Sequence, residues 1–137
     1  MRWLGLDIGQ KRIGVALSDE AEMFAFPLTV IQRTTLAADV AAVLALIAEH
    51  GVTGVAVGEP LELSGRAGAA VRRTRTFTDA LAGRFGGELI FVDERFSTAE
   101  AERVLLSADA SRARRRQVVD KLAAAVILQQ HLERKKA

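Results

Sequence analysis

Three carboxylates stand at the ends of predicted structural elements, where they could bind a divalent cation. Asp7 interrupts an apolar run that should be a buried strand, Glu94 follows another such run, and Asp120 precedes an alanine-rich helical stretch. Mg²⁺ and Mn²⁺ prefer oxygen ligands, and phosphate and water can complete their shell around a few carboxylates. Two such ions about 4 Å apart can activate a water and stabilise the leaving oxygen in phosphodiester cleavage. The three acids therefore predict a metal site for phosphate chemistry.

Each of the first two acids also has a purely structural explanation. Burying an unpaired carboxylate costs several kcal/mol, so Asp7 needs a metal ion or an arginine beside it unless it is only a turn residue at the end of its strand. Glu94 lies in the sequence Asp93-Glu94-Arg95. The ends of strands are where ligands bind in such sheets, but a salt bridge between this segment and Arg95 would explain it equally.

Asp120 lies on an apolar helical face with Ala123, Ala124 and Ile127, so it is expected to point at something positive. The structural alternatives are an acid that favours the helix macrodipole near the N-terminus, or one paired with Lys121 or Arg116. We interpret His50 and His131 as surface or structural residues.

Basic side chains accompany the acids. Lys11 and Arg12 follow Gly9 and could bind a phosphate near Asp7, and Arg95 and Ser97 could do the same beside Glu94. Clustered positive charge is typical of surfaces that bind phosphate backbones, although solvated helix faces and a frayed tail would explain it too. The clusters that we predict to bind substrate contain Arg72, Arg73, Arg114 and Arg115.

The hydrophobic pattern predicts an α/β domain that positions these residues. Two strands, Arg2–Ile8 and Arg12–Ser18, form an antiparallel hairpin, because only Gly9-Gln10-Lys11 joins them. Helical spacing and terminal Thr and Gly residues mark the helices. The other expected elements are strands 26–31, 54–58 and 88–92, helices 34–50, 69–85 and 117–132, a short helix from Ser97 or Thr98 to residue 106, a loop at 59–68 and a polar basic loop at 107–116.

Bulk properties bound the class of protein. The 137 residues suit one domain, and the absence of cysteine excludes disulfides and thiolate metal sites. No apolar run approaches the ~18 residues that a membrane span needs, and an acid interrupts the N-terminal run, so it does not read as a signal peptide. We expect a cytoplasmic protein. Net charge is only +2, although the pI is about 9.5.

Four sequence blocks, in order along nearly the whole chain, resemble the YqgF/RuvX family. The opening block contains the metal candidate Asp7, and the third and fourth contain Glu94 and Asp120. The second block departs from the usual family pattern, because Glu59 stands where an apolar residue is common. The blocks are residues 7–19 (DIGQKRIGVALSD), 57–61 (VGEPL) with Ser64-Gly65, 93–98 (DERFST) and 120–129 (DKLAAAVILQ).

The resemblance implies an RNase H-like fold over residues 1–137, with a five-stranded mixed sheet whose first three strands are antiparallel and whose faces carry helices. It also implies a nuclease that resolves Holliday junctions or matures the 5′ end of pre-16S rRNA. Asp7, Glu94 and Asp120 would then bind Mg²⁺ or Mn²⁺, as two ions. Glu59 could join this site or replace Glu94, since related junction resolvases have an acidic metal ligand at the end of the central strand.

Other functions stay open at this point. The chain could be a non-catalytic nucleic-acid-binding module that kept the fold. It could also be a phosphotransferase of the actin-like and sugar-kinase group, whose first phosphate loop follows an Asp-x-Gly, although one domain of this size lacks the second half needed to enclose a nucleotide. Cutting a four-way DNA junction would require a homodimer, because two symmetric strands must be nicked, whereas trimming RNA would not.

Overall fold

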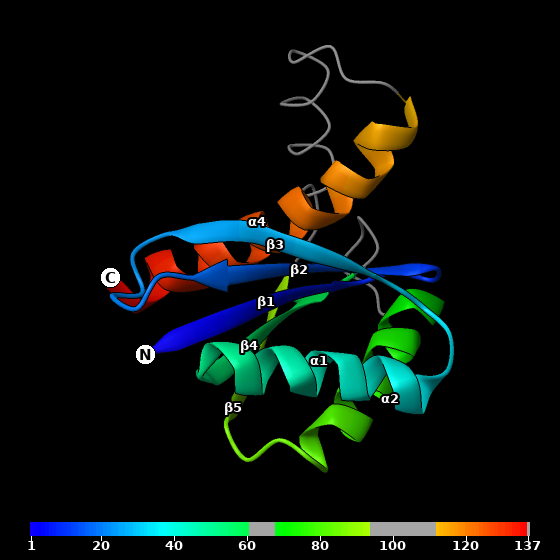
Figure 1. Ribbon diagram of the computed structural model, residues 1–137, viewed down its shortest axis with the longest axis horizontal. Helices are drawn as coiled ribbons and strands as arrows, with labels where there is room; N and C mark the ends of the chain where they lie inside the picture. Colours follow the sequence, from blue (N-terminus) through cyan, green and yellow to red (C-terminus); the bar gives the residue numbers. More distant parts are fainter. Residues whose placement is uncertain (61–67, 94–111, 137) are drawn as a thin grey trace.

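The computed structural model describes residues 1–60, 68–93 and 112–136, except for the side chains of 112–119 and 136. Within these ranges the chain forms one mixed sheet in the order β3-β2-β1-β4-β5. Figure 1 shows α1 and α2 on one side of this sheet and α4 on the other. The predicted α/β architecture is confirmed, and so is the antiparallel start followed by parallel strands. The predicted short helix ending at residue 106 lies outside the described residues, as does most of the loop at 59–68.

The strands match their predicted positions closely. The first two have the predicted bounds, and the other three each extend by one or two residues where a neighbour continues the hydrogen-bond ladder. Their bounds are Arg2–Ile8 (β1), Arg12–Ser18 (β2), Ala25–Gln32 (β3), Val52–Glu59 (β4) and Glu88–Asp93 (β5).

Alternation along the strands creates two apolar layers, because successive side chains point to opposite faces. On β1, Leu4, Leu6 and Ile8 belong to a core shared with α1 and α2. The alternate residue Trp3 belongs to a second core, under α4, which includes Ala124. Asp7 continues the series of Trp3, and its side chain is therefore on the α4 face of the sheet.

The helices α1 (Leu36–His50) and α2 (Ala69–Ala82) are bounded by identifiable caps. Thr35 caps α1 by accepting from the Ala38 N–H, and Gly51 ends it in the left-handed region at φ 63°, which glycine adopts without strain. The prediction that α2 continues to residue 85 was wrong. It ends at Ala82, because Gly83 is a poor helix former and the Arg84 N–H then donates to the Leu81 carbonyl three residues back, as in a 3₁₀ turn.

Helix α4 (Arg112–Lys136) is longer at both ends than the predicted 117–132. The sequence predicts a loop at 107–116, because these residues are polar and basic. Arginine is nevertheless a good helix former, so a run of arginines can continue a helix.

Among the described residues, no helix is both long and apolar enough to cross a membrane.

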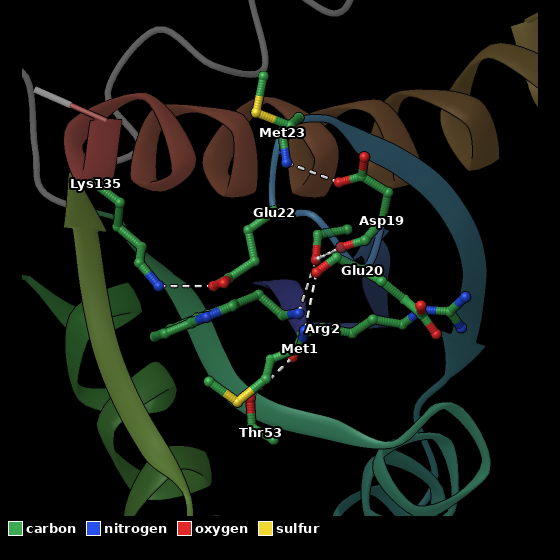
Figure 2. A network of polar contacts seen from close by, with 10 residues as sticks. Met1, Arg2, Asp19, Glu20, Glu22, Met23, Thr53 and Lys135 are labelled. Atoms are coloured by element: carbon green, nitrogen blue, oxygen red, sulfur yellow. Dashed lines mark hydrogen bonds and ion pairs between the residues drawn. The ribbon is translucent and has the colours of Figure 1, made fainter.

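Polar contacts fasten the C-terminal end of α4 to the end of the sheet where β1 begins (Figure 2). Lys135 Nζ donates to Glu22 Oε1 at 2.7 Å, and the terminal amine of Met1 donates to the Glu20 carbonyl at 2.9 Å. The hydrogen bond from Lys135 lowers the pKa of Glu22, against an opposing effect of burial. Asp7 lies at the other end of β1, so these contacts stabilise the opposite end of the sheet and do not involve Asp7.

Candidate active site

Asp7 is the penultimate residue of β1 and is half-buried. Its partner across the antiparallel pair is Gly14 of β2, and directly opposed residues in such a pair present their side chains to the same face. On the other side, Gly58 follows Val57, the β4 partner of Leu6. Glycines therefore stand on both sides of Asp7, and neither fills the space beside its carboxylate with a side chain.

Helix α4 brings Asp120 to the same place. A Cβ added to Gly14 would run into the Asp120 carbonyl oxygen, and one added to Gly5 would lie 2.7 Å from the Leu128 Cβ. Glycine at these two positions lets the helix backbone lie almost on the strands. The Asp120 backbone consequently lies over Gly14, the register partner of Asp7, on the face of the sheet to which Asp7 points, although the two acids are far apart in the sequence.

Asp120 forms an ion pair with Arg12, the first residue of β2. Arg12 Nε donates to Asp120 Oδ2 at 2.6 Å, and the two side chains are 29% and 24% exposed. The explanation of Asp120 as a helix-terminal acid is wrong, because α4 begins at Arg112, more than two turns earlier. The expected positive partner is present, but it is Arg12 rather than the neighbouring Lys121.

Glu59, the contending fourth acid, lies on the opposite face of the sheet. It alternates with Gly58 at the end of β4, and its Oε1 accepts from Arg75 Nη2 of α2 at 3.2 Å. The Arg75 guanidinium also lies 4.3 Å from the ring centroid of Phe91 on β5. The sheet therefore separates Glu59 from Asp7 and Asp120. Asp93 pairs with Glu59 in register and shares its face.

A half-buried arginine, Arg33, holds the loop that follows Asp7. Arg33 Nη1 donates to the Gly9 carbonyl at 3.0 Å, and its Nε donates to Asp39 Oδ2 at 3.0 Å. Asp39, in the first turn of α1, also accepts from the Thr34 N–H at 3.0 Å and is only 2% exposed. Sequence reasoning missed this pair. The sequence contained a signal for it, because Asp39 is an acid directly beside the apolar Val40 in the predicted helix.

The predicted phosphate-binding residues are distributed over several elements. Lys11 is exposed in the turn between β1 and β2, close in sequence to Asp7, whereas Arg12 is engaged with Asp120. Arg72 is exposed on the first turns of α2, with Arg73 half-buried beside it. The remaining candidates lie outside the described side chains: Glu94, Arg95, Ser97, Arg114 and Arg115.

Neither histidine lies beside the candidate metal ligands Asp7 and Asp120. His131 is buried on α4, with its ring 4.2 Å from that of Trp3 between centroids. Burial lowers its pKa, and the nearby positive charge of Lys135 lowers it further. His50 lies at the end of α1, with Nε2 3.8 Å from Glu49. Both positions agree with the structural or surface roles predicted for them.

The donor set around Asp7 suits a hard cation. Carboxylate oxygens are the ligands that Mg²⁺ and Mn²⁺ prefer. In the part of the chain that the structure describes, no three acidic, histidine or cysteine side chains form a group that could hold a metal ion. Of the three predicted ligands, Asp7 and Asp120 lie in that part and Glu94 lies outside it.

Comparison with known proteins identifies close relatives along the whole chain. A sequence profile described as RuvX, Holliday junction resolvase, matches residues 1–134. A protein of Symbiobacterium thermophilum is 50% identical over 137 residues, which are 100% of this chain and 95% of that protein. One from Myxococcus xanthus is 47% identical over 133 residues, 97% of this chain and 88% of the other. Both are named provisionally as pre-16S rRNA nucleases.

Solved structures agree with the fold. RuvC of Thermus thermophilus, in complex with a Holliday junction substrate, has a TM-score of 0.63 at 18% identity, covering 100% of this chain and 97% of RuvC. The fowlpox virus resolvase in complex with Holliday junction DNA has a TM-score of 0.61 at 9% identity, covering 100% of both chains. At such identities the likeness shows the fold alone, which is RNase H-like as predicted. Together with the profile match and the identity to relatives of similar length, it shows that the chain belongs to the RuvX family.

Proposed function

We propose that this protein is a metal-dependent nuclease that hydrolyses phosphodiester bonds in structured nucleic acid. The observation that carries the proposal is the placement of Asp120 over Gly14, the register partner of Asp7, on the face of the sheet to which Asp7 points. Membership of the RuvX family supports the same chemistry.

In this proposal Asp7 and Asp120 hold Mg²⁺ or Mn²⁺, with Glu94, which follows the last residue of β5, as a third ligand. When bound, two ions supply an activated water and stabilise the leaving oxygen. The exposed Lys11 binds a backbone phosphate next to the cleaved bond. Arg72 and Arg73 contact phosphates farther along the strand. Glu59 has no part in the reaction, because it faces α2 and is paired with Arg75.

Pre-16S rRNA is the first candidate substrate, because relatives of similar length are named as nucleases of that RNA. A four-way DNA junction is the second, since the matching profile describes a junction resolvase. The two substrates differ in what they require of the protein. Junction resolution needs a homodimer with two active sites related by symmetry, whereas trimming the 5′ end of an RNA needs one active site.

The test compares cleavage of a synthetic four-way junction with cleavage of a pre-16S rRNA fragment, in Mg²⁺ and in Mn²⁺. Asp7→Asn, Asp120→Asn and Glu94→Gln should each lower the rate at least about 100-fold, since each removes a metal ligand. Asp7→Asn should still bind the uncut substrate as well as wild type or better, because it removes a negative charge near the phosphates. Glu59→Gln and the exposed Asp79→Asn are matched controls and should cleave as wild type does.

A non-catalytic binding module would give a different pattern. The wild-type protein would then bind one of the two substrates, yet neither it nor any variant would cut under either metal. Equal cleavage by wild type and Asp7→Asn would also exclude the proposed site.

A further inference from the structure

Arg12 forms an ion pair with Asp120, the carboxylate that binds a metal ion in the proposed function. Its Nε lies 2.6 Å from Asp120 Oδ2, so the guanidinium is a direct counter-ion of that side chain. Arg12 and a metal cation at Asp120 compete for the negative charge of this carboxylate, and directly for its Oδ2. A strong ion pair between Asp120 and Arg12 therefore weakens the binding of a cation to Asp120, and a bound cation weakens the ion pair.

The position of Arg12 on the sheet makes this contact a built feature rather than a chance pairing of surface chains. Arg12 and Gly14 are two residues apart on β2, so both face α4. The Arg12 carbonyl accepts from the Gly9 N–H at 2.9 Å, which closes the turn after Asp7. The backbone that carries Arg12 is thus fixed both to the turn and, through Gly14, to the helix that carries Asp120.

The ion pair is nevertheless open to exchange. Both side chains are about a quarter exposed, and ion pairs that reach solvent are weak. A guanidinium that leaves the carboxylate stays within reach of any phosphate bound beside Asp7 and Asp120. Arginine suits that second partner, because its planar fork matches phosphate oxygens.

We propose that Arg12 is an exchangeable counter-ion that couples metal binding to substrate binding. Without metal, Arg12 neutralises Asp120 and keeps the carboxylate in position. When a cation takes Asp120, Arg12 is released and binds the substrate phosphate that faces the cation. This inference rests on the proposed function, since it requires Asp120 to be a metal ligand.

Two measurements on the intact protein test the exchange. The first is the Mn²⁺ dissociation constant without nucleic acid, measured by electron paramagnetic resonance of free Mn²⁺. Arg12→Gln should bind Mn²⁺ at least about threefold more tightly than wild type, because a competing positive charge is gone. Arg75→Gln is the matched control, because it breaks a comparable ion pair on the opposite face, and its Mn²⁺ affinity should equal that of wild type.

The second measurement is the ratio of junction or rRNA affinities in Ca²⁺ and in EDTA. In wild type the cation should tighten nucleic-acid binding, and by linkage the nucleic acid tightens cation binding equally. Arg12→Gln should lose most of this ratio, whereas Arg12→Lys, which keeps the charge, should retain much of it. Melting temperatures identify any variant that is unfolded, and Arg12→Lys then carries the test.

The outcomes separate this inference from the proposed function. If Asp7→Asn and Asp120→Asn weaken Mn²⁺ binding while Arg12→Gln leaves it unchanged or weakens it, the site stands and the counter-ion exchange is overturned. A purely structural Arg12 would lower the melting temperature and leave the Ca²⁺-to-EDTA ratio intact. If neither aspartate variant alters Mn²⁺ binding, the proposed metal site itself fails.

Discussion

Arg33 shows how a residue outside the reaction can decide whether the loop behind Asp7 keeps its shape. Its guanidinium joins the buried Asp39 carboxylate to the Gly9 carbonyl and lies 5.6 Å from the ring centroid of Phe77. Removing it leaves a charged carboxylate buried without its ionic partner. Arg33→Gln should therefore lower the free energy of unfolding by about 3 kcal/mol, measured by urea denaturation, whereas the exposed Arg84→Gln should change it by less than about 0.5 kcal/mol.

His131 gives the stability a pH dependence with a defined sign. Burial lowers its pKa in the folded protein below the ordinary 6.5. As pH falls below that value the unfolded chain takes up a proton and the folded chain does not, so stability is lost between the unfolded and the folded pKa and is unaffected above both. The melting temperature should therefore fall more between about pH 7 and 5 for wild type than for His131→Gln. Parallel curves for the two proteins would refute this assignment.

At the scale of elements, the site depends on how closely α4 approaches β1 and β2. Gly14 permits that approach, because any Cβ there would collide with the Asp120 backbone. Gly14→Ala should move the helix, lower stability by about 2 kcal/mol as overpacking does, and reduce cleavage more than the lost stability explains. Gly86→Ala is the matched control, since a Cβ there meets nothing within 4 Å. Full activity of folded Gly14→Ala would show that the close approach is unnecessary.

The elements also show what a single sequence can and cannot predict. The apolar runs and the short turn between them predict β1 and β2 with their observed bounds, and Asp7 stands out because it interrupts the first run. Helix ends are less predictable from sequence. The charged residues 112–116 can form a loop or continue a helix, and Gly83 can end a helix or lie within one, so packing decides both cases. The Arg12–Asp120 and Arg75–Glu59 pairs depend on strand register and helix placement, which local pattern does not specify.

At the scale of the whole molecule, net charge is small, and nucleic-acid affinity must come from local clusters of arginine and lysine. Binding of the uncut substrate by Asp7→Asn should weaken as salt rises, because each contacted phosphate releases counterions. Arg72→Gln combined with Arg73→Gln should reduce the slope of log affinity against log salt by up to about two units, at roughly 0.9 per phosphate. An affinity that does not respond to salt would exclude these clusters as the contact surface.

Oligomeric state distinguishes the two candidate substrates at this same scale. A junction resolvase should sediment as a dimer when bound to a four-way junction, because both strands must meet an active site. A nuclease that trims pre-16S rRNA can act as a monomer. Sedimentation of the protein alone, with a junction and with an rRNA fragment should therefore agree with the substrate that is cut, and a monomer on an efficiently cleaved junction would contradict symmetric resolution.

In the proposed active site, Asp7 and Asp120 hold one metal centre on the α4 face of the sheet. Anomalous diffraction from crystals soaked in Mn²⁺ tests it most directly, because manganese is located independently of any activity. We expect an anomalous peak at coordination distance, about 2.2 Å, from carboxylate oxygens of both Asp7 and Asp120, and we expect Asp7→Asn to lose it. A peak on the opposite face beside Glu59, or none near Asp7, would contradict it.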